Sequence, residues 1–294
     1  MQHDRPVTHL TRARDRDGGI GWWARDDAGG WGALPAGTTL GALLALDADA
    51  FVERLGAVAR TSADPGVTPV APVDDDTEVW AAGVTYEISR QARMEESSEA
   101  SVYEAVYDAA RPELFFKSIG WRVQGPGAPI GVRADSTWDV PEPELGLVCN
   151  AAGAVVGYVV VNDVSSRSIE GENPLYLPQA KMYRGSCAVG PSIALAAAVP
   201  DPYRLAITAQ ILRGGAPLWR GATSTSRLHR TFDELVGYLY RAEVFPRGVV
   251  LATGTSAVPD NDVTLRPGDE VVIEIENVGT LSNTVAPADW AAGG

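Results

Sequence analysis

The sequence predicts a β-rich α+β fold with a small N-terminal domain. Valine-rich apolar runs of strand length are joined by glycine-containing turns. Helical periodicity is confined to two segments, and a stretch rich in Pro, Gly and Asp separates the first quarter of the chain from the rest. The 294 residues are 45% hydrophobic, which is enough for one large domain with a smaller companion.

The first part of the chain combines Trp- and Gly-rich turns with one segment of helical pattern. In residues 39–60, Leu and Val recur at spacings of three and four, which predicts a single amphipathic helix. The aperiodic segment SADPGVTPVAPVDDD follows at 62–76. We therefore place a domain boundary there, with a small domain over 1–75 and a catalytic domain over 76–294.

The second part contains mainly strands. LGLVCN at 145–150 and VVGYVVVNDV at 155–164 are predicted to form a hairpin that is buried on both faces. RLAITAQILRGG at 204–215 with PLWRGATS at 217–224 forms a second pair, and RPGDEVVIEIENVGTL at 266–281 supplies a late strand after a Pro-Gly turn.

One helix in this part is well specified. Thr231 and Glu234 have the spacing of a capping box at its start. An apolar face follows, made by Phe232, Leu235, Val236 and Leu239.

The composition excludes several classes of function. A formal charge of −14 repels nucleic acid and anionic lipid. The first 15 residues lack the apolar stretch of a signal peptide, and no run of about 18 apolar residues occurs, so we expect a cytoplasmic protein with a small-molecule ligand. Cys149 and Cys187 have no metal-ligand spacing, which disfavours zinc and predicts two core thiols.

Three carboxylates are predicted to converge. Glu142 and Glu144 lie two residues apart on an extended segment, so both project to one face. Asp163 ends the next apolar strand, and a hairpin would return it beside them. Such a group suits Mg²⁺, with Mn²⁺ and Ca²⁺ as alternatives. From spacing alone, however, a solvated strand face is the better interpretation of two nearby glutamates in an acidic protein.

A series of motifs in fixed order gives this group more weight. The motifs are GVTY (83–86), PELFFK (112–117), EPELGLV (142–148), GYVVVNDVSSR (157–167), KMYRGSCAVGP (181–191), LATGT (251–255), LRPGDEV (265–271) and GTLSN (279–283). This series covers about residues 78–285 and resembles the catalytic domain of the fumarylacetoacetate hydrolase superfamily.

The resemblance implies a rolled mixed sheet, a homodimer or homotetramer, and a divalent ion held by Glu142, Glu144 and Asp163. Members of the superfamily act on 2-oxo acids, whose carboxylate and keto oxygens can chelate a metal ion. Lys181 matches the active-site lysine and is expected to carry a proton or stabilise charge, with a carboxylate as the alternative base.

The resemblance also indicates substrate contacts. Gly254 and Thr255 match a turn suited to a substrate carboxylate, although Thr255 as a plain turn residue is nearly as good an interpretation. Arg167 follows Asp163 at the family spacing and either contacts substrate or pairs with a carboxylate. Tyr86 and Ser89, in and after the GVTY motif, are the remaining candidates.

The sequence departs from the hydrolases at one place. Their His-Glu pair, spaced H-x-x-E, activates water, and the matching positions here are Ser89 and Ala92. Without this pair, a reaction that needs no external water is favoured. Glu113 in the PELFFK motif is followed by Leu, Phe and Phe, which could shield its carboxyl group from water, and it is the candidate general acid. That Glu113 is a plain surface glutamate is an equally good interpretation.

Within the superfamily, the string GVTYEISRQARMEES and the chain length are most similar to dehydratases. We therefore expect dehydration of a 2-keto-3-deoxy sugar acid of the D-arabinonate type to 2,5-dioxopentanoate through a metal-stabilised enolate. A hydrolase or decarboxylase of an acylpyruvate or 2,4-diketo acid is the alternative enzyme, and an inactive metal-binding homologue is the alternative of another class.

Overall fold

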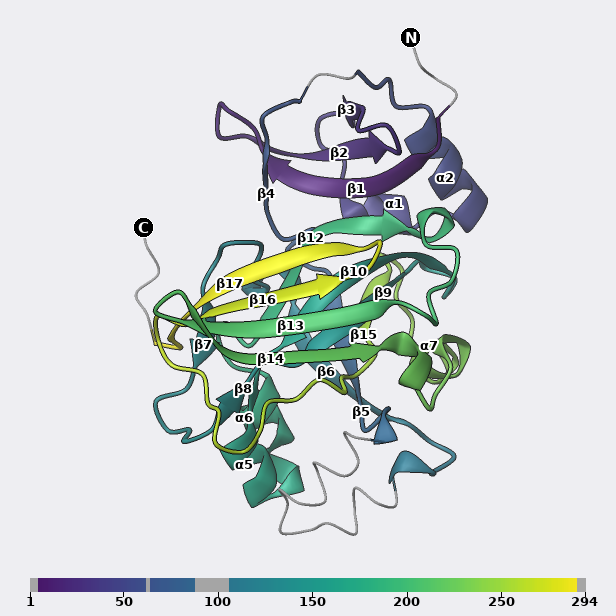
Figure 1. Cartoon of the computed structure of the whole chain (residues 1–294). Helices are drawn as coiled ribbons and strands as arrows, with labels where there is room; N and C mark the ends of the chain where they lie inside the picture. Colours follow the sequence, from purple (N-terminus) through teal and green to yellow (C-terminus); the bar gives the residue numbers. More distant parts are fainter. Residues whose placement is uncertain (1–4, 62–63, 88–105, 290–294) are drawn as a thin grey trace.

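The structure is a computed structural model that describes residues 5–61, 64–87 and 106–289 (Figure 1). In this part of the chain the strands form a ten-stranded sheet, a five-stranded sheet and a two-stranded ladder. Strand β15 (Val249–Ala252) runs parallel to β5 (Glu78–Gly83) and antiparallel to its other neighbour, so the large sheet is mixed. The predicted β-rich α+β class is confirmed.

The predicted central hairpin is formed by β9 (Pro143–Cys149) and β10 (Val155–Asp163). Gly153 in its turn has φ of 80°, a left-handed conformation that glycine adopts without steric cost. All seven residues of β9 are buried, which explains why this strand is apolar throughout instead of alternating.

Residues of the central hairpin belong to two hydrophobic clusters. On one face, the five-stranded sheet packs through Ile207 and Ile273 onto Leu145 and Leu147. In Figure 1, β13 and β17 cross in front of β9 and β10. The five strands, in spatial order, are β14 (Ala216–Ser224), β13 (Ala206–Arg213), β16 (Glu270–Ile275), β17 (Gly279–Pro287) and β7 (Ile130–Val132).

The N-terminal strands extend the large sheet. They are drawn in purple at the top of Figure 1. Leu10 in β1 pairs with Ile193 in β12 (Cys187–Leu195), so hydrogen bonding continues between the two parts of the chain. The division at residues 75 and 76 therefore stays a proposal about folding units. The remaining strands of this region are β1 (Val7–Arg14), β2 (Ile20–Asp26), β3 (Trp31–Ala33) and β4 (Thr68–Pro69).

The single helix predicted over 39–60 is wrong in one respect, because the structure contains two helices there. They are α1 (Leu40–Leu44) and α2 (Ala48–Gly56). Asp47 is extended, with φ of −66° and ψ of 167°, and its carboxylate accepts the N–H of Ala50 at 2.8 Å. Its side chain thus starts a new helix instead of continuing the first.

The helix predicted after Thr231 is confirmed as α7 (Phe232–Leu239). The Thr231 hydroxyl accepts the N–H of Glu234 at 3.1 Å, while the Glu234 carboxylate pairs with Arg230. All four residues of the predicted apolar face are buried. No helix in the described ranges has both the length and the apolar character to cross a membrane.

Candidate active site

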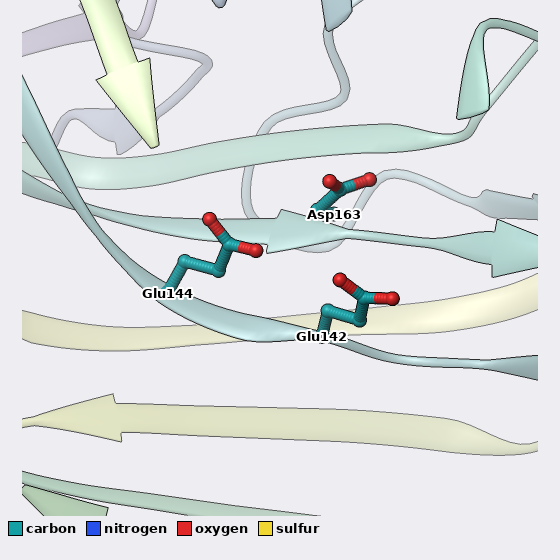
Figure 2. A group of neighbouring side chains, drawn as sticks. All are labelled: Glu142, Glu144 and Asp163. Carbon is teal, nitrogen blue, oxygen red and sulfur yellow. The ribbon is translucent and has the colours of Figure 1, made fainter. Parts of the chain in front are cut away.

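Three buried carboxylates converge at one end of the central hairpin. Glu142 directly precedes β9, Glu144 lies within it, and Asp163 ends β10. One oxygen atom from each lies within 4.8 Å of the others. Figure 2 shows the three carboxylates turned to the same side of the two strands. The predicted convergence is confirmed, and the solvated strand face is excluded because each residue is at most 4% exposed.

The charge of this cluster fits a hard divalent cation. Burial and the negative charges of Asp163 and Glu142 raise the pKa of Glu144 well above its usual range. Buried like charges at this separation require compensating cations, which basic side chains and a bound ion can both supply. A donor set of carboxylate oxygens is the type that Mg²⁺ and similar ions prefer.

Lys181 lies at the end of α6 (Leu177–Lys181) and points into the cluster. Its Nζ is 2.9 Å from an oxygen of Glu142 and 3.2 Å from one of Asp163, and it donates to the Ser165 hydroxyl at 2.6 Å. The residue is 1% exposed. Lys181 is therefore a buried side chain among the carboxylates, and its role as a proton carrier stays a prediction.

Lys117 is a second buried cation at the same cluster. It lies on β6 (Glu113–Ile119), and its Nζ is 2.5 Å from the second oxygen of Asp163. Nζ also donates to the backbone carbonyls of Val164 at 3.1 Å and Lys181 at 2.5 Å. Asp163 is thus held between two ammonium groups.

Lys117 is not among the residues that the sequence predicts for the site, although the sequence carries a signal. The chain has 24 basic residues, and only Lys117 and Lys181 are lysines. Both are buried against Asp163. The absence of lysine elsewhere in the sequence is the signal that points to Lys117 as a second site residue.

A small pocket opens beside the cluster. It is lined by Glu142, Asp163 and Lys181 together with Glu113, Arg167 and Thr255. Most of the residues predicted for the site therefore meet in one place.

Arg167 begins α5 (Arg167–Glu172) and is buried. It lies 3.1 Å from a carboxylate oxygen of Glu142 and 3.6 Å from one of Glu170. Glu170, which the sequence argument also missed, is buried and lines the pocket. Pairing with a carboxylate, one of the two roles expected for Arg167, is confirmed. Its contact with substrate stays a prediction.

Gly254 supports the cluster through its backbone. It donates its N–H to Glu144 at 2.7 Å. Its φ is 91°, and a side chain there would overlap the hydroxyl of Thr85. Gly254 therefore orients a carboxylate, and its contact with substrate stays a prediction, as does that of Thr255.

The remaining candidates lie around or outside the pocket. Tyr86 is 1% exposed and is not among the described residues that line the pocket. Burial, followed by the charge of Glu144, raises the pKa of its phenol. Ser89 and Ala92 lie outside the described residues. Glu113 is partly buried, and a side chain at Gly83 would overlap its carboxylate.

Comparison with protein families decides the relationship. Residues 79–286 match the model of the fumarylacetoacetate (FAA) hydrolase C-terminal domain, which is more than half of the chain. The chain belongs to the fumarylacetoacetate hydrolase family. The mixed sheet of this part of the chain agrees with this membership.

Two relatives in the family have names that state an activity. A probable 2-keto-3-deoxyxylonate dehydratase of Haloferax volcanii is 51% identical over 248 residues, covering 79% of this chain and 86% of the relative. A 2-dehydro-3-deoxy-D-arabinonate dehydratase of Saccharolobus solfataricus is 44% identical over 215 residues, covering 72% of each.

A solved structure of the family is also similar over nearly the whole chain. It is a 2-keto-3-deoxy-D-arabinonate dehydratase complexed with magnesium and 2,5-dioxopentanoate. It is 36% identical, with a TM-score of 0.83, and the match covers 95% of this chain and 99% of the other. The similarity thus includes the N-terminal part that lies outside the family model.

Proposed function

We propose that this chain is a hydro-lyase that dehydrates a 2-keto-3-deoxypentonate to 2,5-dioxopentanoate, with Mg²⁺ as its cofactor. The observation that carries the proposal is the buried group of three carboxylates and Lys181 beside one pocket. Named relatives at 44% and 51% identity are dehydratases of such acids. The magnesium complex of a similar structure supports the choice of ion.

Glu142, Glu144 and Asp163 would hold the ion. When bound there, a divalent ion supplies a Lewis acid that polarises the 2-oxo group and stabilises the negative charge that develops beside it. Gly254 and Arg167 keep two of these carboxylates in place, through the N–H of Gly254 to Glu144 and the guanidinium of Arg167 to Glu142.

The chain's own residues would then move protons. In our proposal Lys181 removes a proton from C3, and Glu113, across the same pocket, protonates the hydroxyl that leaves C4 as water. One C–H bond and one C–O bond break, and a C3–C4 double bond forms. A proton lost from C5 and one returned to C3 convert this product to the C4–C5 enol, which becomes the 5-aldehyde when its hydroxyl loses a proton and C4 gains one. Sequestration from bulk water would protect these intermediates.

The absent His-Glu pair favours dehydration over hydrolysis. Ser89 and Ala92 provide no base for an attacking water, and general-base catalysis contributes about 100- to 10,000-fold. Without that contribution, cleavage of an acylpyruvate should be slow. The sugar acid, in contrast, carries its own leaving group.

Product analysis tests the proposed reaction. Metal-loaded enzyme incubated with a 2-keto-3-deoxypentonate should give a product lighter by one water, with an aldehyde that a hydrazine reagent traps. The control substrate is an acylpyruvate. Faster release of pyruvate and a second acid from that control would show that the enzyme is a hydrolase. Absence of turnover on both substrates, with metal bound, would indicate a binding homologue.

The metal ligands have their own test. We expect Glu144→Gln to weaken Mn²⁺ binding at least about tenfold, because one of three anionic ligands is lost and Gln is a poorer ligand for a hard ion. Calorimetry on metal-free protein measures the affinity. Glu274→Gln on the exposed face of β16 is the matched control and should bind normally. Equal affinities in both variants would remove Glu144 from the ligand set.

We also propose that the protein forms a homodimer or homotetramer. The family relationship supports this assembly. Light scattering on the purified protein distinguishes the two states from a monomer.

A further inference from the structure

Lys117 has an arrangement of contacts that differs from that of Lys181. Its ammonium group donates to the backbone carbonyls of Val164 and Lys181 and forms an ion pair with a carboxylate oxygen of Asp163. It is 1% exposed and does not line the pocket among the described residues, whereas Lys181 does. Lys117 is therefore placed to hold protein groups and not to meet a substrate.

The groups that Lys117 joins come from three separate elements. Lys117 itself lies on β6, Asp163 ends β10, and Lys181 ends α6. On β6 the side chains of Glu113 and Phe115 share one face, because strand side chains alternate. The register with β5 shifts at Lys117, and the ion pair with Asp163 places its Nζ at the carboxylate cluster. Glu113 and Phe115 line the pocket, so the strand that carries the proposed acid also carries this cation.

Strand β6 lies at the end of the large sheet, so contacts outside the sheet contribute to holding it in place. Its one neighbour within the described sheet is β5, which pairs with β6 from Glu78 opposite Ile119 to Gly83 opposite Glu113. On the side facing the pocket, the bonds of Lys117 to Asp163 and to the Lys181 carbonyl tie β6 to the other two elements.

We propose that Lys117 is a positioning residue that fixes β6, β10 and α6 relative to one another. It thereby sets the orientation of the Asp163 carboxylate and the distance from Glu113 to Lys181. The inference uses the proposed function for the roles of Glu113 and Lys181, but the placement of Asp163 is independent of it.

The use of lysine at this position supports the proposal. The chain uses arginine for its basic residues everywhere except at 117 and 181. An ammonium group is compact and directs three donors in different directions, whereas a guanidinium is planar and larger. The three oxygen atoms around Nζ, two carbonyls and one carboxylate, belong to three residues, an arrangement that a planar guanidinium does not match.

Metal affinity separates this role from simple neutralisation of charge. In Lys117→Met the apolar stem is kept and the donors are lost. If Lys117 orients Asp163, Mn²⁺ should bind about 10- to 100-fold more weakly, as for loss of other groups that hold metal ligands. If Lys117 only neutralised charge, its removal would leave the site more negative and the ion would bind more tightly. Tighter or unchanged binding, measured by calorimetry on metal-free protein, would overturn the proposal.

Two further variants control for other effects. Lys117→Arg keeps the charge, and we expect it to bind Mn²⁺ nearly as weakly as the Met variant; native affinity in Lys117→Arg would show that charge is sufficient. Arg60→Met removes an equally buried cation that pairs with Asp26 in the N-terminal part at 3.5 Å. It should lower the melting temperature without changing Mn²⁺ affinity, and a weakened affinity there would show that general loss of stability explains the effect.

The kinetic constants provide a second readout. A positioning role predicts that Lys117→Met lowers kcat by about 10- to 100-fold at saturating metal, with a smaller change in KM, because the acid and base are displaced while the pocket remains. A native kcat at saturating metal would contradict the claim about Glu113 and Lys181. If the native enzyme proves inactive on the sugar acid, the proposed function fails while the metal-affinity result still decides the role of Lys117.

Native protein offers a further test. Because the chain has two lysines, protein labelled with ¹⁵N-lysine should give two side-chain nitrogen signals. Adding Mg²⁺ should shift both, since both Nζ atoms contact Asp163. The signal that disappears in Lys117→Met belongs to Lys117, and the absence of a shift in this signal at saturating Mg²⁺ would show that Lys117 is not coupled to the metal carboxylate.

Discussion

Replacing Lys181 by Met is expected to reduce kcat by about 100- to 10,000-fold, which is the usual contribution of a proton-transferring side chain. Methionine fills a similar volume without a donor or acceptor for protons. Lys181 contacts Glu142 and Asp163 from within the pocket and can reach a bound acid. Steady-state kinetics at saturating Mg²⁺ measures the loss.

Two measurements decide what the loss means. Mn²⁺ affinity in Lys181→Met should stay within about tenfold of native, because the three carboxylates remain. Lys181→Arg keeps a cation in place, but an arginine side chain stays protonated near neutral pH and cannot act as a base. We expect Lys181→Arg to be as inactive as Lys181→Met. Substantial turnover by the Arg variant would assign charge stabilisation to Lys181 and move the base to a carboxylate.

The convergence of the carboxylates was predictable because it depends on local geometry. Side-chain alternation relates Glu142 to Glu144 within three residues, and a short turn returns Asp163 through β10. Hairpin pairing preserves such relations whatever the rest of the fold does. The family motifs then separated this cluster from an ordinary acidic strand.

Lys117 and Glu170 could not be found in the same way. Lys117 reaches Asp163 across 46 positions of sequence, and this contact requires that β6 and the end of β10 lie on the same side of the pocket. Periodicity along one strand carries no such information. The position of Glu170 in the pocket wall depends on how α5 packs, and this packing involves the whole domain.

The break between α1 and α2 was not predicted, because the apolar periodicity was given more weight than the capping residue Asp47. The apolar spacing over 39–60 continues through Asp47, so the segment was predicted as one helix. Capping by Asp47 satisfies the first N–H groups of α2 and stabilises the break by about 1 kcal/mol. In short helices that pack against a sheet, such a cap outweighs continued periodicity.

Glu113→Gln is expected to block dehydration at a different step from Lys181→Met. Glutamine has nearly the same shape and can still donate a hydrogen bond, but it cannot transfer a proton to the hydroxyl that leaves C4. The loss in kcat should again be about 100- to 10,000-fold. The variants differ in what remains: Glu113→Gln keeps Lys181, the carboxylates and the ion.

This difference can be observed as hydrogen exchange. In D₂O, Glu113→Gln should incorporate deuterium at C3 of the unreacted 2-keto-3-deoxypentonate, above the rate without enzyme, because proton removal no longer leads to loss of water. Lys181→Met should show neither exchange nor product. NMR of the recovered substrate measures both. Glu274→Gln, which changes an exposed glutamate on β16, is the control and should turn over normally.

If Glu113→Gln dehydrates at the native rate, the acid is another group in the pocket, and the partly buried Glu113 serves only to shape it. If Glu113→Gln is inactive and shows no exchange, Glu113 acts before the C–O bond breaks, and the division of labour between the two residues proposed above is wrong.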